Sequence, residues 1–404
     1  MSTSPAPTFD HAATKARHAD LTVLELGMGW FPEQAGGLNR VYHDLVRSLP
    51  AVGVRCIGVI TGSDLAARES GGAVRAVVPT GSSVLQRWKA IHSAARQVLS
   101  REKIDVISAH FAIYTRPVLG LIGNTPFVFH FHGPWAAEGA REGASKLATA
   151  AKAWIERSVY RRADRLIVLS ESFRTLLCDS YGVDPARVHI VPGAVDCARY
   201  DVPQSRAQAR ETLGWPTDRP TVLAVRRLVP RMGLEDLIQA AQQLREQHPT
   251  LLVHIAGKGP LTAALQQQID AAGLQNNVKL LGYVSDEALP LAYRAADFSV
   301  VPTVALEGFG LIAIESLAAG TPVIVTPVGG LPEAVQGLSP RLVCDAIGPA
   351  ALANAMAAAL NDPGSLPTAD ACRQYAQSHH DLPVIARQTR AVYEQALRDR
   401  RGPL

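Results

Sequence analysis

Cysteine is scarce in this chain, and its placement argues against two common structural devices. The 404 residues include five cysteines, an odd number, and no two of them form a C-x-x-C pair. Disulfide frameworks use paired cysteines in secreted chains, and structural zinc sites use closely spaced ones. We therefore expect neither device, and the pattern fits a reducing cytoplasm. The cysteines are Cys56, Cys178, Cys197, Cys344 and Cys372.

Long apolar runs are also missing. The uncharged stretch 117–137 comes closest, but two prolines and two histidines interrupt it. Because a membrane-spanning helix needs about 20 mostly apolar residues, we expect no segment to cross a membrane. The start of the chain, residues 1–20, is rich in Ser, Thr, Pro and Ala and has no apolar core. It is predicted to be a flexible tail rather than a secretory signal.

Neither sign of charge dominates: 40 basic residues stand against 36 acidic ones. Residues 1–200 hold 23 Lys and Arg against 17 Asp and Glu, a balance that would suit an anionic lipid or a phosphorylated acceptor. The segments 86–103 and 146–165 are the candidates for contact with an anionic membrane. An ordinary surface, with basic helix edges in solvent, explains the same counts more simply. No concentrated basic or aromatic platform exists, so nucleic acid is not an expected partner.

Short apolar strands alternate with amphipathic helices twice along the chain. This alternation predicts an α/β fold with two doubly wound, Rossmann-like domains and a cleft between them. In such sheets, ligands bind beyond the carboxyl ends of the strands. We place the first domain at 21–200, a linker at 201–219, the second domain at 220–365 and the final helices at 366–404.

The stretch 307–315, E-G-F-G-L-I-A-I-E, is the most informative. It follows an apolar strand and begins a helix after an open turn. Such a helix N-terminus binds anions through unpaired N–H groups and the positive end of the helix dipole. Glu307 precedes the turn, and Glu315 lies roughly one and a half turns into the helix. The carboxylates can therefore bind two ends of an extended ligand whose anionic centre lies on the turn, and a nucleotide sugar has that shape.

Glu-x7-Glu alone arises often by chance, but its surroundings here do not. Residues 307–333 read E-G-F-G-L-x-x-x-E-x-x-A-x-G-T-P-V-I-V-T-x-V-G-G-x-P-E. The chain closely resembles the retaining glycosyltransferases of family 4, glycosyl transferases group 1, which have the GT-B fold. The resemblance runs from the first strand to about Glu333. It implies transfer of a hexose from a nucleoside diphosphate sugar to an acceptor hydroxyl. It also implies that the final helices cross back to the first domain.

The resemblance assigns roles to the residues of the 307–315 stretch. Glu315 would bind the ribose hydroxyls of the donor. Glu307 would be catalytic, binding the sugar hydroxyls and orienting the donor. The backbone amides of the turn between them would bind the diphosphate; they belong to Phe309, Gly310 and Leu311.

A second motif, V-R-R-L-V-P-R-M-G at 225–233, departs from the family pattern. The family sequence G-R-L…K-G places an Arg and a Lys on the donor diphosphate. Arg227 aligns with that Arg, and a guanidinium can bind two phosphate oxygens at once. Met232 replaces the Lys, and Arg226 replaces the Gly. Two interpretations stay open: other arginines compensate, which is favoured, or the site is weakened or redirected.

Glycines mark two further strand exits. Gly36 and Gly37 begin a helix after the first strand and match the family loop that contacts the donor phosphates and acceptor. Gly257 permits close approach of a ligand to the backbone, although a tight turn explains it equally well. Val284 matches the segment whose backbone meets the nucleotide base. A nicotinamide enzyme is disfavoured because G-x-G-x-x-G is missing after the first strand.

Three histidines lie at strand exits. His130 and His132 share one face of a strand, since residues two apart do so. His132 matches the family's cleft histidine beside the reacting sugar and is the second catalytic candidate, whereas His130 would be structural. His110 is a candidate for the acceptor pocket. Three histidines without a nearby carboxylate raise zinc as an alternative, but the ligand spacing disfavours it.

Asp-x-Asp, the usual metal-binding signature of the other large glycosyltransferase fold, is missing from the chain. We therefore predict no metal and no cofactor, with the leaving-group charge stabilised by amides, a helix dipole and arginine. By analogy, the acceptor is a saccharide or a lipid-linked molecule in bacterial surface or exopolysaccharide assembly. The enzyme would work in the cytoplasm or at the inner face of the membrane. UDP, GDP and ADP sugars are all compatible with the motifs.

Two alternatives remain. One is another GT-B enzyme, such as a phosphorylase or a sugar-nucleotide epimerase. The other is a sugar-nucleotide-binding subunit without turnover, which the replacement of the family Lys by Met232 makes conceivable.

Overall fold

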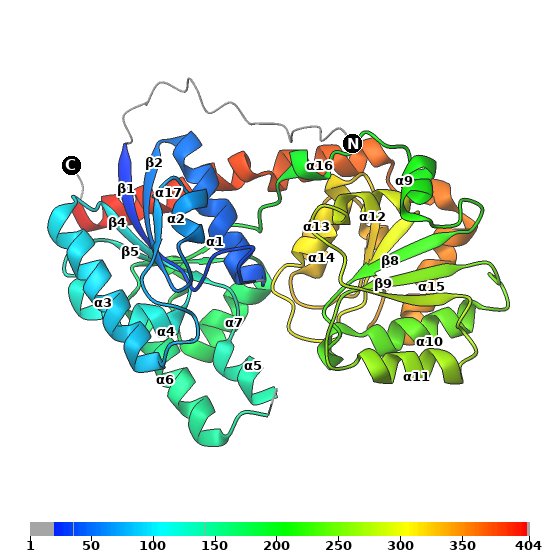
Figure 1. Cartoon of the computed structure of the whole chain (residues 1–404), viewed down its shortest axis with the longest axis horizontal. Coiled ribbons are helices and arrows are strands. Elements are labelled where there is room, and N and C mark those ends of the chain that lie inside the picture. Colours follow the sequence, from blue (N-terminus) through cyan, green and yellow to red (C-terminus); the bar gives the residue numbers. More distant parts are fainter. Residues whose placement is uncertain (1–19, 35, 142, 402–404) are drawn as a thin grey trace, which may run out of the picture.

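The computed structural model describes residues 20–34, 36–141 and 143–401, and within them the chain forms two parallel α/β units (Figure 1). The tail predicted for residues 1–20 lies, except for Asp20, outside the described residues. The sheet of the first unit has seven strands in the order β3-β2-β1-β4-β5-β6-β7, and that of the second has five in the order β10-β9-β8-β11-β12. All pairings are parallel, which is the arrangement of the GT-B fold.

The first unit is built around the buried central strands β1 and β4. Their side chains are almost fully buried because helices cover both faces of the sheet, as expected for parallel strands. Its strands are β1 (Leu21–Leu26), β2 (Val54–Ile60), β3 (Val74–Ala76), β4 (Val106–Ala109), β5 (Phe127–Phe131), β6 (Arg165–Val168) and β7 (Val188–Ile190). Its helices are α1 (Gly37–Ser48), α2 (Leu65–Glu69), α3 (Val84–Arg101), α4 (Ala112–Thr115), α5 (Trp135–Arg141), α6 (Lys146–Arg162) and α7 (Glu171–Tyr181).

The second unit repeats the pattern on a smaller sheet. Two apolar clusters cover the two faces of this sheet, one including α10 and α15 and the other including α12, α13 and α14. The strands are β8 (Thr221–Val225), β9 (Leu252–Ala256), β10 (Val278–Gly282), β11 (Phe298–Val301) and β12 (Val323–Val325). The helices are α10 (Leu234–Leu244), α11 (Thr262–Ala271), α12 (Leu289–Ala295), α13 (Leu311–Ala318), α14 (Leu331–Val335) and α15 (Pro349–Asn361).

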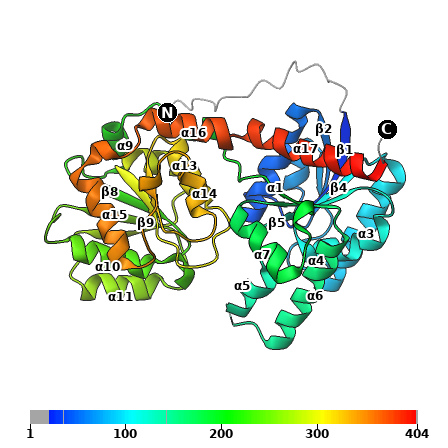
Figure 2. The ribbon, with the colours of Figure 1, turned by 180° about the vertical axis from the view of Figure 1, so that it is seen from behind.

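The chain passes between the units twice, at neighbouring places. Helix α16 (Ala369–His380) packs on α13 of the second unit, whereas α17 (Leu382–Arg401) packs on α1 and the central strands of the first (Figures 1 and 2). At the crossing, the Val195 amide donates to the His380 carbonyl (2.9 Å), and the Cys197 amide donates to the Asp381 carboxylate (3.2 Å). The outgoing and returning segments are therefore bonded to each other.

One local expectation differs from the structure. The stretch 201–219, expected to be a linker, contains α9 (Arg206–Leu213), which follows the short α8 (Cys197–Tyr200) and packs on α12. The Arg210 side chain is buried and pairs with Asp297 (2.8 Å), which anchors α9 to the second unit. Prolines and the lack of strand periodicity pointed to a connection, but a short helix with a polar anchor fits the same composition.

Candidate active site

The two glutamates of the 307–315 stretch lie at different depths of one site in the second unit. Glu307 lies in the loop between β11 and α13, and its side chain is 15% exposed. It pairs with the guanidinium of Arg226, which also donates to the Thr303 hydroxyl. The Arg226 side chain is 7% exposed. The arginine that replaces the family glycine is thus ion-paired with the carboxylate predicted to bind the sugar.

The β8–α10 loop carries two more arginines. Arg227 is exposed, whereas the guanidinium of Arg231 donates to the Leu306 carbonyl (2.7 Å). Burial lowers the pKa of Arg231; the carboxylates of Glu138 and Glu307 raise it, and the positive charges of Arg227 and Arg226 lower it. The β8 exit therefore carries three arginines, one of which is paired with Glu307.

Met232 does not point into this charged group. Its side chain is buried in the apolar cluster of α10, where the charge of a lysine would be poorly solvated. The next residue, Gly233, has φ 69°, and an added Cβ would lie 1.8 Å from the Pro302 carbonyl oxygen. The backbone of this turn therefore contacts the β11 exit directly.

Glycines of the 307–330 region lie where a side chain would clash with neighbouring atoms. An added Cβ would lie 2.7 Å from the Phe173 ring at Gly308, and 1.9 Å from the Glu307 carbonyl oxygen at Gly329. Gly310, at φ 84°, precedes α13 as its N-cap, so the first amides of that helix have no partner within the helix. The Phe309 side chain is buried against His380, which leaves only its backbone available for the predicted contact with a diphosphate.

Glu315, on α13, is buried and already engaged. It accepts a hydrogen bond from the Tyr293 hydroxyl (3.2 Å) and pairs with Arg40 of α1 across the two units (3.4 Å). Arg40 also lies 3.6 Å from Asp286. Burial alone would lower the pKa of Arg40, but the neighbouring carboxylates, Glu315 first, raise it overall. The predicted ribose carboxylate thus forms an ion pair between the units.

Open space lies at the start of α1, on the side of the first unit that carries Arg40. Gly36 has φ 143° and precedes the helix as its N-cap, without a side-chain cap. An added Cβ at Gly36 or Gly37 would meet no atom of the described residues within 4 Å. The predicted phosphate and acceptor loop is therefore a helix N-terminus with room in front of it, a geometry that favours anions.

Gly257 packs closely against the neighbouring strand exits. At φ 145°, its added Cβ would lie 1.8 Å from the Arg226 carbonyl oxygen, and its amide donates to the Gly282 carbonyl (2.7 Å). The exits of β8, β9 and β10 are thereby bound to one another. Val284 is partly buried just beyond, next to Tyr283, over which the Lys258 ammonium lies at 5.5 Å.

Histidines at the exits of β4 and β5 stack on one another. The rings of His110 and His130 lie 4.1 Å apart, and those of His110 and His132 lie 5.3 Å apart, all nearly parallel. The expectation that no carboxylate lies near them is wrong, because Glu25 of β1 is 3.3 Å from His110 Nε2. The signal was a charged residue within L-T-V-L-E-L, an otherwise apolar strand. Burial lowers the pKa of His110 to about 3 and that of His132 well below its usual range.

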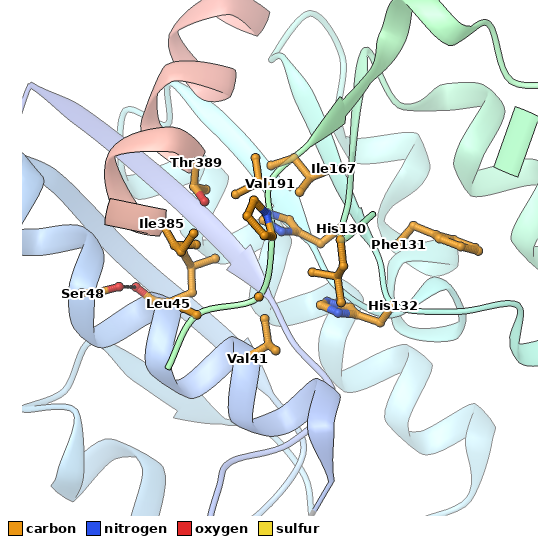
Figure 3. A pocket seen from close by; sticks show the side chains of 14 residues that line it. Val41, Leu45, Ser48, His130, Phe131, His132, Ile167, Val191, Ile385 and Thr389 are labelled. Atoms are coloured by element: carbon orange, nitrogen blue, oxygen red, sulfur yellow. Dashed lines mark hydrogen bonds between the residues drawn. The ribbon is translucent and has the colours of Figure 1, made fainter. Parts of the chain in front are cut away.

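A hollow adjoins His132 on the side of the crossing helix. Side chains from α1, β5 and α17 and the segment 191–194 enclose it (Figure 3). Its lining is mostly apolar apart from His130, His132 and two hydroxyl side chains. The labelled lining residues are Val41, Leu45, Ser48, His130, Phe131, His132, Ile167, Val191, Ile385 and Thr389.

The last residue of the 307–333 sequence, Glu333, contacts the first unit. Its carboxylate accepts hydrogen bonds from the amides of Glu171 (2.7 Å) and Ser172 (3.1 Å) at the start of α7. The Ser170 hydroxyl donates to the Gly308 carbonyl (2.7 Å) beside it. This part of the sequence therefore connects the units, a role that spacing alone does not reveal.

Within residues 20–34, 36–141 and 143–401, two kinds of feature are absent. No helix there is both long and apolar enough to cross a membrane. No group of three or more His, Cys, Asp or Glu side chains there is arranged to bind a metal ion.

Sequence profiles of two families match the chain. Glycosyl transferases group 1 matches residues 205–379, and Glycosyltransferase Family 4 matches residues 35–199. Together these matches span most of the chain, one on each unit.

Individual proteins give the same result. Glycogen synthase of Mycobacterium tuberculosis (strain CDC 1551 / Oshkosh) is 28% identical over 95% of this chain and 97% of its own. D-inositol 3-phosphate glycosyltransferase of Mycolicibacterium smegmatis is 40% identical over 46% of this chain and 43% of its own. Among solved structures, sucrose-phosphate synthase from Thermosynechococcus elongatus has a TM-score of 0.75 at 24% identity, covering 93% of this chain and 98% of its own. Alr3699/HepE of Anabaena in complex with UDP-glucose has a TM-score of 0.74 at 19% identity, covering 93% and 100%.

Proposed function

The chain belongs to the family 4 glycosyltransferases of the GT-B fold, and on that premise we propose that it is a retaining hexosyltransferase. It would move a hexose from a nucleoside diphosphate sugar to an acceptor hydroxyl. One observation carries the proposal: two carboxylates, Glu307 and Glu315, flank the N-terminus of α13, and the arginines of the β8–α10 loop lie beside Glu307.

The donor would lie along α13. The Glu315 carboxylate, oriented by Tyr293, would accept hydrogen bonds from the ribose hydroxyls. Arg227 and the amides at the start of α13 would bind the diphosphate, since charge-assisted contacts and the helix dipole both favour it there. Glu307 would bind the sugar hydroxyls, and His132 would contact the sugar near its anomeric carbon. The complex of HepE with UDP-glucose makes UDP-glucose the first donor to test.

Arg226 would replace the missing lysine of the family motif. In the structure it pairs with Glu307, and a bound diphosphate would bring competing negative charge to the same guanidinium. The sugar hydroxyls would in turn offer hydrogen bonds to Glu307. This exchange of partners favours the interpretation in which the replacement at Met232 is compensated rather than disabling.

The transfer itself would need no protein nucleophile. The acceptor oxygen would bond to the anomeric carbon on the face that the diphosphate leaves, and its proton would pass to a departing phosphate oxygen. The configuration at the anomeric carbon is then retained. The arginines and the α13 dipole would stabilise the leaving-group charge without a metal ion, so chelators should leave the activity unchanged.

The acceptor is proposed to be a saccharide or a lipid-linked molecule, bound on the first unit at the cytoplasmic side of the membrane. Helix α6 supports this membrane contact. Its Leu147 side chain is 83% exposed and its Trp154 side chain is 58% exposed, and both lie among basic side chains. The Arg116 guanidinium lies 4.8 Å from the centre of the Trp154 ring. Exposed apolar side chains among cations favour an anionic membrane surface.

Vesicle flotation tests this surface contact. Binding to vesicles with anionic lipid should fall in Leu147→Ser/Trp154→Ser. Vesicle binding should be unchanged in Ile347→Ser, which also removes an exposed apolar side chain but lies on the second unit. Equal binding of all three proteins would remove the membrane proposal.

Labelled UDP-, GDP- and ADP-hexoses separate the proposed transfer from its alternatives. Label in an added saccharide or polyprenyl phosphate sugar supports transfer, and the anomeric proton coupling of the product tests retention. Release of hexose 1-phosphate with added inorganic phosphate would indicate a phosphorylase, and a changed hexose would indicate an epimerase. Calorimetric donor binding without turnover would indicate the subunit without catalysis.

A further inference from the structure

Glu25 is a carboxylate in the centre of the first sheet. It belongs to β1, is fully buried, and has apolar neighbours along its own strand. Because burying such a group without partners is costly, its partners define its purpose. The Tyr393 hydroxyl donates to Oε1 (2.9 Å), and His110 Nε2 lies 3.3 Å from Oε2.

The contacts continue from Glu25 through His110 to His132. His110 Nδ1 lies 3.1 Å from His132 Nε2, and His132 is the partly exposed end of this series. A second branch starts at Tyr393 and leads to His130. Tyr393 also contacts the Ser108 hydroxyl (2.9 Å) and His130 Nε2 (3.2 Å). Tyr393 comes from α17, so the helix that crosses back completes the network around Glu25.

If Glu25 is ionised, only one placement of the protons on His110 and His132 satisfies the contacts of this series. A carboxylate only accepts, so His110 Nε2 must carry a proton. A neutral His110 then has a lone pair on Nδ1, which can only accept from His132 Nε2–H. A neutral His132 is left with a lone pair on Nδ1. Burial supports the neutral imidazoles, because it lowers the pKa of each of them.

We propose that Glu25 is a positioning residue for His132: through His110 it fixes the tautomer in which His132 Nδ1 accepts a hydrogen bond. This inference rests on the proposed role of His132 beside the donor sugar, where an acceptor nitrogen suits a sugar hydroxyl. The arrangement follows the rule that the partner of one ring nitrogen decides what the other nitrogen can do. The ring stacking keeps the three imidazoles nearly parallel and so maintains the contact between His110 and His132.

Imidazole ¹⁵N NMR of histidine-labelled protein at pH 7.5 tests the proposal without any assay of transfer. The His132 resonances are identified by their loss in His132→Asn. In the wild type, we expect the proton of both His110 and His132 on Nε2. In Glu25→Gln, the new amide can donate to His110 Nε2, and both tautomers should invert.

Tyr393→Phe is the matched control. It removes a hydrogen bond from the same carboxylate but leaves the contact of Oε2 with His110, so the tautomers of the wild type should persist. In transfer assays, Glu25→Gln should lower kcat roughly tenfold, the magnitude of one lost hydrogen bond. The donor KM should stay within about twofold in this variant, because the diphosphate and ribose contacts lie on the second unit.

Two results would overturn the proposal. One is a wild-type spectrum with the His132 proton on Nδ1, which decides the matter even if Glu25→Gln fails to fold. The other is a folded Glu25→Gln whose tautomers match those of the wild type. Inverted tautomers in a protein that transfers no sugar would instead keep this inference and remove the proposed function.

Discussion

The ion pair between Arg226 and Glu307 predicts that stability and catalysis can be separated. Both side chains are largely buried, at 7% and 15% exposed. Glu307→Ala would leave the guanidinium buried with Thr303 as its remaining partner. Breaking a buried pair on one side costs about 3–5 kcal/mol, and the retained Thr303 contact places the expected loss near the lower value. That is a large part of the roughly 5–15 kcal/mol that stabilises most proteins.

Replacing both members should give a different result. In Arg226→Met/Glu307→Leu no charge remains buried, and such replacements are often neutral. Urea unfolding followed by circular dichroism should show a clear loss in Glu307→Ala and recovery of most of it in the double variant. Glu287→Ala, which removes an exposed carboxylate of the same unit, should match the wild type.

Transfer activity should not recover with stability. Both variants lack Glu307, so neither should transfer sugar, however stable it is. A double variant as unstable as Glu307→Ala would refute the contact with Arg226. Wild-type turnover in the recovered double variant would refute the role assigned to Glu307.

Three further outcomes are expected. Arg227→Met should weaken binding of UDP-glucose roughly ten- to hundredfold in calorimetry, whereas Arg245→Met should not; equal affinities would exclude Arg227 from the diphosphate site. Met232→Lys should lower the unfolding temperature without tightening donor binding, because the side chain is buried among apolar neighbours; tighter binding would show that the native site lacks a cation. The folded-state pKa of His110 is lowered to about 3, so the folded protein binds fewer protons than the unfolded chain below pH 6.5. As the pH decreases below 6.5, the unfolding free energy should therefore fall by about 1.4 kcal/mol per pH unit for each such imidazole. A flat urea midpoint from pH 7 to 5 would contradict this.

The fold could be predicted from the sequence because each strand and helix leaves a pattern within a short stretch of residues. Apolar strands such as Phe298–Val301 and amphipathic helices such as Leu234–Leu244 are visible within windows of a few residues. Their alternation is sufficient to predict two doubly wound sheets.

The contacts of the candidate site depend on residues distant in sequence. Arg226 meets Glu307 across 81 residues, and Glu25 meets Tyr393 across 368. Pairs so far apart leave no periodic pattern in the sequence. A charged residue inside an apolar strand does signal a buried polar contact, as at Glu25, but it does not name the partner. The position of α17 was likewise available only through the resemblance to a family.

The central claim is that the donor diphosphate lies between the β8–α10 arginines and the N-terminus of α13. A crystal structure of the protein with UDP-glucose tests it most directly. We predict phosphate oxygens within hydrogen-bond distance of Arg227 and of the amides at 309–311, with the ribose on Glu315. A nucleotide bound elsewhere, or phosphates that contact neither group, would contradict the account.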